Sequence, residues 1–176
     1  MRESGVTLLE LLITVVIAVI LVGVAIPSFL QMIQNNRVIT YTNELVTALN
    51  LARSEAVKRN EQIMVSACNT SVDCNGTGSN WSVGWVVWVN ANDSDNGGSP
   101  PIPTMDDGEQ LRVFNSVRDN ATITGPSNNV AFLATGASGS TVRECFGLAI
   151  PDATTFRRVR VALSGGVVVD SDVSCP

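Results

Sequence analysis

Residues 5–30 read "GVTLLELLITVVIAVILVGVAIPSFL", and Glu10 is the only charged side chain among them. As a helix, the 22 residues from Val6 to Pro27 span about 33 Å, close to the thickness of the hydrocarbon core of a bilayer. We therefore expect one membrane-crossing helix here. A carboxylate at membrane depth costs about 2.5–3.5 kcal/mol on insertion scales, so Glu10 needs a partner. Its own segment contains no Lys, Arg or His, so that partner must come from elsewhere.

Composition sets the limits of the remaining chain. After Pro27 there remain 149 of the 176 residues, enough for one globular domain with its own core. The balance of 11 basic to 16 acidic residues argues against a general nucleic-acid-binding protein. Four cysteines indicate two disulfides and an oxidising compartment. A membrane segment followed by a cysteine-bearing domain fits export from the cytoplasm.

Two ordinary interpretations of the N-terminus stay open beside the one developed below. Five residues precede the apolar run, and in them Arg2 is offset by Glu3. The small residues 23–25 could form a secretory cleavage site after the apolar run. A plain single-pass anchor is the other interpretation, and it leaves Glu10 unexplained.

The stretch "GVTLLELLI" (residues 5–13) resembles the class III signal of type IV pilins and type II secretion pseudopilins, whose pattern is G-F-T-L-x-E. The resemblance implies that a prepilin peptidase cleaves after Gly5 and that the new first residue, Val6, is N-methylated. Glu10 and Pro27 then fall at mature positions five and 22, where the family has a glutamate and a helix-bending proline. This chain departs from the family in one place, because Val6 stands where Phe is usual.

The resemblance also supplies a partner for Glu10, namely the amino terminus of a neighbouring subunit in a fibre. Opposite charges attract strongly in a medium of low dielectric, and a wrong register would leave the carboxylate unpaired. Glu10 is thus expected to set the register of assembly. The Pro27 ring would clash with the carbonyl of Gly23 and bend the helix, either as a fixed kink at the membrane exit or as a hinge used in assembly.

A helical pattern continues beyond the proline. We predict one helix from about Val6 to Arg59, with its first half in lipid and its second half packed on a domain. The stretch "ALNLARSEAVKRN" (residues 48–60) resembles the corresponding part of the FimT/GspH group of minor pilins and pseudopilins. The apolar stripe recurs at spacings of three and four, at Val38, Tyr41, Leu45, Leu49, Ala52 and Ala56.

The rest of the chain predicts short strands separated by Gly, Pro, Asn and Ser. The fold class is therefore α+β, and the resemblance implies the type IV pilin fold, a long N-terminal helix packed on a C-terminal antiparallel β-sheet domain. The expected organisation is a cleaved leader (1–5), a hydrophobic assembly helix (6–29) and a periplasmic head (30–176). "NWSVGWVVWVNANDSDNG" resembles the FimT/GspH pattern of a W-x-x-G-W strand and an Asn/Asp-rich turn. Strands are expected at residues 62–67, 84–90, 110–114, 121–123, 130–133, 144–150, 157–163 and 166–170.

The sequence argues against enzymes and metal proteins. It has no histidine, which excludes His-dependent triads and His-ligated zinc, and it has no phosphate-binding glycine loop. Asp93 and Asp95 alternate as in a calcium loop, but Gly97 and Thr104 stand at the next ligand position and at the twelfth. An Asx-rich turn explains this composition equally well. We therefore expect no catalysis, no cofactor and no metal.

The four cysteines allow three pairings. Cys68 and Cys74 are near neighbours, while Cys145 and Cys175 bracket the last predicted strands. We favour the pairs Cys68–Cys74 and Cys145–Cys175, with the two other pairings left open. No C-x-x-C spacing occurs, so a structural role is expected for all four.

Basic side chains gather near the C-terminus. On a strand, Arg158 and Arg160 would share one face, and the valines between and after them would point to the core. FimT-type minor pilins that act as DNA receptors carry a G-R-x-R motif there. Arg158 and Arg160 match R-x-R, but Arg157 stands at the glycine position. Four of the 11 basic residues fall within 18 positions: Arg143, Arg157, Arg158 and Arg160.

These arginines have a second interpretation, an exposed strand face with ion pairs to Asp152, Asp170 or Asp172.

The sequence as a whole predicts a minor type IV pilin, held in the inner membrane with its head in the periplasm and then incorporated at or near the tip of a pilus. Its expected partners are prepilin peptidase and other major and minor pilins or pseudopilins. The alternatives are a tip subunit that binds duplex DNA for natural transformation, and a minor pseudopilin of a type II secretion system.

Overall fold

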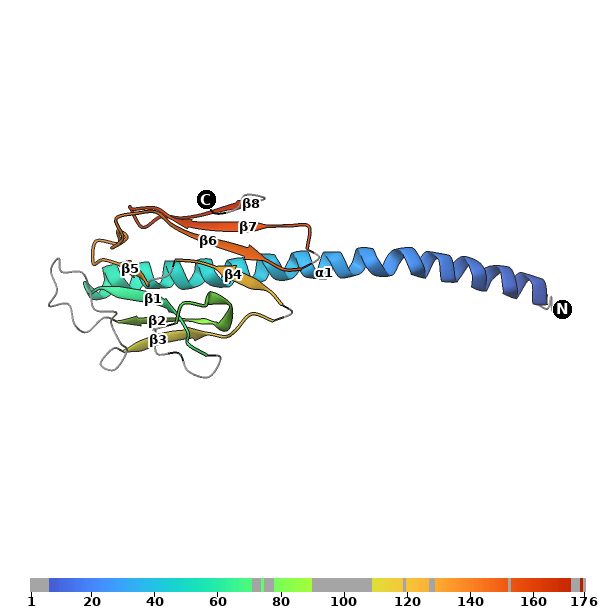
Figure 1. Ribbon diagram of the computed structural model, residues 1–176, viewed down its shortest axis with the longest axis horizontal. Coiled ribbons are helices and arrows are strands. Elements are labelled where there is room, and N and C mark those ends of the chain that lie inside the picture. The colour runs from blue at the N-terminus through green and yellow to red at the C-terminus, as the bar shows by residue number, and fades with distance from the viewer. Residues whose placement is uncertain are drawn as a thin grey trace, which may run out of the picture.

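A computed structural model describes residues 7–70, 74, 78–89, 109–118, 120–126, 129–151, 153–171 and 175. Within these residues the chain forms one long α-helix, one short 3-10 helix and eight strands, which confirms the α+β class (Figure 1). The elements are α1 (Leu8–Arg59), β1 (Ile63–Ala67), η1 (Trp81–Val83), β2 (Trp85–Val89), β3 (Gln110–Phe114), β4 (Thr122–Thr124), β5 (Val130–Phe132), β6 (Glu144–Ala149), β7 (Arg157–Val161) and β8 (Val167–Ser171).

The long helix has a defined cap at each end. Thr7 is the N-cap, and its side-chain oxygen accepts a hydrogen bond from the backbone N–H of Glu10 at 3.2 Å. At the other end Asn60 adopts a left-handed conformation (φ 56°) and its backbone N–H donates to the carbonyl of Ala56. The 52 residues of α1 span about 78 Å. The predicted single helix is thus confirmed from Leu8 to Arg59.

The strands form two sheets where the sequence predicted one antiparallel sheet. The first sheet has the order β3-β2-β1-β5 and the second has the order β4-β6-β7-β8, and all pairs are antiparallel. The division arises because β5 returns to pair with β1, while β6, β7 and β8 pair consecutively in a separate meander. Figure 1 shows α1 running between the two sheets.

The core of the head lies where α1 meets both sheets. The predicted stripe is buried there from Leu45 onward, with Leu45 and Leu49 fully inaccessible and alanines beside them that let the strands approach, while Tyr41 is half-buried. Trp81 of η1 packs edge-to-face on Phe146 of β6, with ring centroids 4.7 Å apart, and so joins the two sheets. Each large apolar side chain buried in this way contributes about 1.5–3 kcal/mol. One continuous core therefore holds helix and sheets together.

The head has a complete core without the first half of the helix. Among the described residues, every side chain of the main core lies between Leu45 and Val161, and the satellite cluster nearest the N-terminus begins at Val38. The described side chains from Leu8 to Phe29 are exposed and take no part in this core. We therefore expect residues 30–176 to fold as an independent domain.

One helix side chain fastens both sheets to α1. Arg53 donates from Nε to the carbonyl of Gly136 at 3.0 Å and from Nη2 to the carbonyl of Ser164 at 3.3 Å. Gly136 follows β5 of the first sheet, and Ser164 lies in the turn between β7 and β8 of the second. Gly165 in that turn has φ +77°, and a Cβ there would collide with the Gly136 carbonyl. The two turns are thus closely packed under one guanidinium.

This arrangement predicts a loss of stability in Arg53→Met. The substitution keeps the apolar stem but removes two charged hydrogen bonds to backbone carbonyls, so the free energy of unfolding of the head should fall by about 1–3 kcal/mol. Urea denaturation measures the change. The control is Lys58→Met, which removes an exposed pair with Glu55 (3.3 Å) and should change stability by less than about 0.5 kcal/mol. Equal effects of the two variants would contradict the assignment.

Candidate functional site

The first half of α1 is an apolar surface that nothing in the described part of the chain covers. The exposed fraction is 83% for Leu8 and 63% for Phe29, and the large apolar side chains that the structure describes between them are all exposed. The helix is long and apolar enough to cross a membrane. A contiguous exposed surface of this size requires lipid or other helices around it.

Glu10 lies in the first turn of this apolar segment and is exposed. No described residue donates a hydrogen bond or forms an ion pair with its carboxylate. The T-x-x-E spacing of Thr7 and Glu10 is that of a capping box, a sequence signal that marks the start of a helix. The Thr7 half of the box is formed, and the carboxylate lies at the positive end of the helix dipole. The Thr7 cap uses only the backbone N–H of Glu10, so the carboxylate stays available for an ion pair.

The expected cleavage site and the expected bend have different outcomes. Gly5 and Val6 lie outside the described residues. Gly23 and Pro27 lie inside one uninterrupted helix, and Figure 1 shows only a gentle curve of its N-terminal half. A Cβ built at Gly23 would meet no atom within 4 Å, so packing within this chain does not require a glycine there. The bend stays a prediction for the assembled state.

Both disulfides join the cysteines that the sequence favoured. Cys68 is bonded to Cys74, and Cys145 is bonded to Cys175 with a Cα–Cα distance of 6.0 Å. The second bond attaches the C-terminal residues to β6. In the chain-entropy account, closing a loop of 30 residues stabilises the fold by about 3–4 kcal/mol.

The arginines near the C-terminus do not form one open cationic patch. Arg158 Nη2 and Arg160 Nε donate to the same Asp170 oxygen, Oδ2, at 3.1 and 2.7 Å. Asp170 lies opposite Arg158 in the register of β7 and β8. Arg157 has a buried Nε that finds no hydrogen-bond partner among the described residues, whereas Arg143 is exposed in the segment before β6. The geometry is that of the predicted ion-paired strand face.

The shared carboxylate is held in its ionised form. The hydrogen bond from Arg160, followed by that from Arg158, lowers the pKa of Asp170 below its ordinary value of 3.8, against an opposing effect of burial. The same contact raises the pKa of Arg160. Among the described residues, two guanidinium groups therefore share this one carboxylate.

Several residues named in the sequence analysis lie outside the described part of the chain. They are Asp93 and Asp95 of the calcium-like stretch, and Asp152 and Asp172, which were alternative ion-pair partners. Within the described ranges, no group of three or more Cys, Asp or Glu side chains is placed to hold a metal ion.

Comparison with known proteins places the chain in a family. The family model described as "Type II transport protein GspH" matches residues 41–165. A crystal structure of the type IV minor pilin FimU from Pseudomonas aeruginosa strain PAO1 has the same fold, with 20% identity, a TM-score of 0.51, and coverage of 73% of this chain and 88% of that chain. A second crystal form of FimU gives 20% identity, a TM-score of 0.50, and coverage of 75% and 92%. No curated protein matches the chain.

The Asp170 cluster predicts a specific acid response. Because the pKa of Asp170 is lowered in the folded head, its stabilising contribution is present above about pH 4 and is lost as the pH falls through the lowered pKa. Asp170→Asn should lower the thermal midpoint at about pH 6, and the difference from wild type should shrink at about pH 2.5. Glu61→Gln, at an exposed position outside the described ion pairs, should change little at either pH. A difference that persists in acid would contradict the assignment.

Proposed function

Because this chain belongs to the GspH family of type II transport proteins, we propose that it is a minor pilin that assembles through α1 into a type IV pilus, at or near the tip. The family and the fold are those of structural subunits and not of enzymes. The observation that carries the proposal is the exposed apolar half of α1, which continues without a break into the helix that anchors the head.

The proposed cycle has two stages with one requirement, that this apolar surface stays covered. Before assembly, residues 6–29 cross the inner membrane and the head lies on the periplasmic side. During assembly the same surface moves from lipid into a bundle of pilin helices. Because apolar side chains are covered in both places, the transfer changes little of the hydrophobic free energy. Small differences in packing and charge can then decide where a subunit is inserted.

Glu10 supplies that difference in the proposal. Prepilin peptidase would cleave after Gly5 and expose an ammonium group at Val6, which is then methylated. In the fibre this ammonium of one subunit would meet the Glu10 carboxylate of its neighbour. An unpaired carboxylate in the bundle costs several kcal/mol, so the paired register is preferred over all others. The local capping contact with Thr7 uses only the backbone N–H of Glu10 and is compatible with this pairing.

The family description itself names type II transport, so a minor pseudopilin of a type II secretion system is a variant of the same proposal. Both would use α1 in the same way. Capture of duplex DNA has less support. A phosphate would have to displace Asp170 from Arg158 and Arg160, on a chain whose net charge is −5.

The first test concerns processing. In cells that contain prepilin peptidase, the mature chain should begin at a methylated Val6, and Gly5→Val should leave the leader uncut. Intact-mass measurement of the purified protein distinguishes these products. A mature chain that starts after Ala25, or a wild-type chain that keeps its leader, would contradict the proposal.

The second test separates the effect of the Glu10 charge from the effect of the Thr7 cap. Glu10→Ala and Glu10→Gln should both insert normally into the membrane, because each removes an unfavourable charge from lipid. Both should be lost from sheared fibres when wild-type partners are present, since neither can pair with an ammonium. The control is Thr7→Ala, which removes the cap but keeps the charge and should still be incorporated. If Glu10→Gln is incorporated like wild type, the charge of Glu10 does not set the register of assembly.

A further inference from the structure

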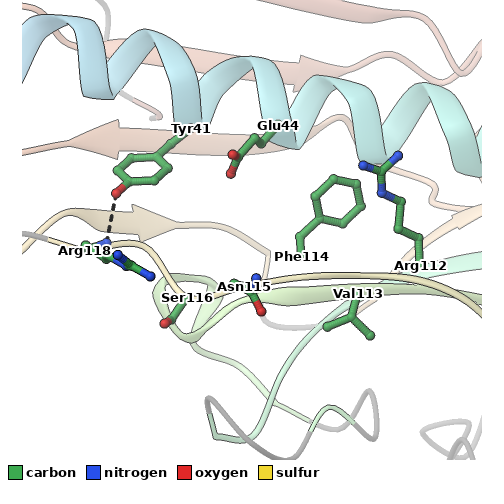
Figure 2. Close-up of a pocket in the computed structure, with 8 residues that line it drawn as sticks. All are labelled: Tyr41, Glu44, Arg112, Val113, Phe114, Asn115, Ser116 and Arg118. Atoms are coloured by element: carbon green, nitrogen blue, oxygen red, sulfur yellow. Dashed lines mark hydrogen bonds between the residues drawn. The ribbon is translucent and has the colours of Figure 1, made fainter.

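A groove of about 470 Å³ lies between α1 and β3, away from both the apolar half of α1 and the arginines of β7. Figure 2 shows Tyr41 and Glu44 reaching into it from the helix, with residues 112–116 and Arg118 on the opposite wall.

The groove presents hydrogen-bond donors that are already oriented. The Tyr41 hydroxyl oxygen accepts a hydrogen bond from the backbone N–H of Arg118 at 3.0 Å, so its own hydrogen is available to a ligand (Figure 2). The Arg112 guanidinium lies over the ring of Phe114, 4.9 Å from its centroid. Phe114 is in turn stacked on the buried Trp85, with centroids 5.6 Å apart. A guanidinium held against a ring in this way keeps its N–H groups free for an acceptor.

The charges of the groove favour a carboxylate. Arg112 and Arg118 are both exposed, and neither forms an ion pair with any residue that the structure describes. Glu44 is the one acidic side chain among the lining residues. Two guanidinium groups with one carboxylate make a locally positive, donor-rich surface on a chain of net charge −5. Arginine forms bidentate hydrogen bonds with carboxylates, which makes Asp or Glu side chains the best-matched ligand.

The groove has the character of a protein interface. Its charged side chains are exposed, whereas a small-molecule pocket encloses most of its ligand. Arg, Tyr and Phe are the residues enriched at protein interfaces. A polyphosphate such as nucleic acid carries more negative charge than an acidic protein segment, so its repulsion by Glu44 and by the acidic chain as a whole is greater.

Position points to a neighbouring subunit as the partner. Under the proposed function, on which this step rests, Glu10 meets the amino terminus at Val6 of a parallel neighbour. The helices are then offset by four residues, which is about 6 Å. Two heads so nearly level lie side by side, and a groove that flanks α1 is at the level of the neighbouring head. We infer that this groove binds an Asp- or Glu-bearing segment on the head of the adjacent subunit in the fibre.

Photo-crosslinking in assembling cells tests the inference. A benzoylphenylalanine at Asn115 of the full-length chain should form, on irradiation, an adduct with an acidic head segment of another subunit, identified by mass spectrometry. The same probe at Val168, exposed on the other sheet, is the control and should give at most about a tenth of that adduct. An adduct with nucleic acid or lipid, or none above the control, would overturn the inference.

Charge reversal gives an independent test. Arg112→Glu with Arg118→Glu should reduce the amount of the chain in sheared fibres by about tenfold or more, because charged hydrogen bonds to the neighbour become repulsion. The head should keep its thermal midpoint, since both side chains are exposed. The matched control, Arg143→Glu, should be incorporated normally. Normal incorporation of the double variant would overturn the inference alone, whereas absence of the wild-type chain from fibres would overturn the proposed function as well.

Discussion

The packing of α1 between the two sheets is the interaction on which the rest of the molecule depends. Leu45 and Leu49 are buried against both sheets, and Arg53 holds a turn from each sheet under its guanidinium. Because α1 is continuous from Leu8 to Arg59, this packing also sets the direction in which the exposed apolar half leaves the head. While α1 keeps this uninterrupted form, the position of the helix sets the orientation of the head.

Three groups of charges on this scaffold differ in what surrounds them. Among the described residues, Glu10 has no charged partner in its apolar segment, where a lone charge is costly and a partner is strongly favoured. Asp170 already has two arginines on a partly solvated strand face, so its charge is paired within the head. Arg112 and Arg118 have no such partner among the described residues and face a groove. These settings favour contacts at Glu10 and at the groove, and a closed structural role for the β7 arginines.

The candidate site could be predicted from sequence only where it is local. Glu10 stands out because it interrupts an apolar run, and the positions of the cysteines along the chain favoured the pairs that the structure contains without excluding the others. The state of the β7 arginines could not be decided in this way. Asp170 and two other acids were equally available in sequence, and the register of β7 against β8 selected Asp170. The sequence contains no pattern that marks the groove, because residues 112–118 meet Tyr41 only after the chain has folded.

The sequence by itself determined the long helix, its apolar half, the eight strand positions and the α+β class. Hydrophobic periodicity and turn residues are local properties, and they specify elements without specifying partners. Tertiary structure alone decided that the strands form two sheets, because β5 pairs with β1 across a sequence gap while β6 to β8 pair in order. It also decided that Asp170 pairs with two arginines. Strand register and sheet order depend on contacts between distant residues, for which a single sequence carries no direct record.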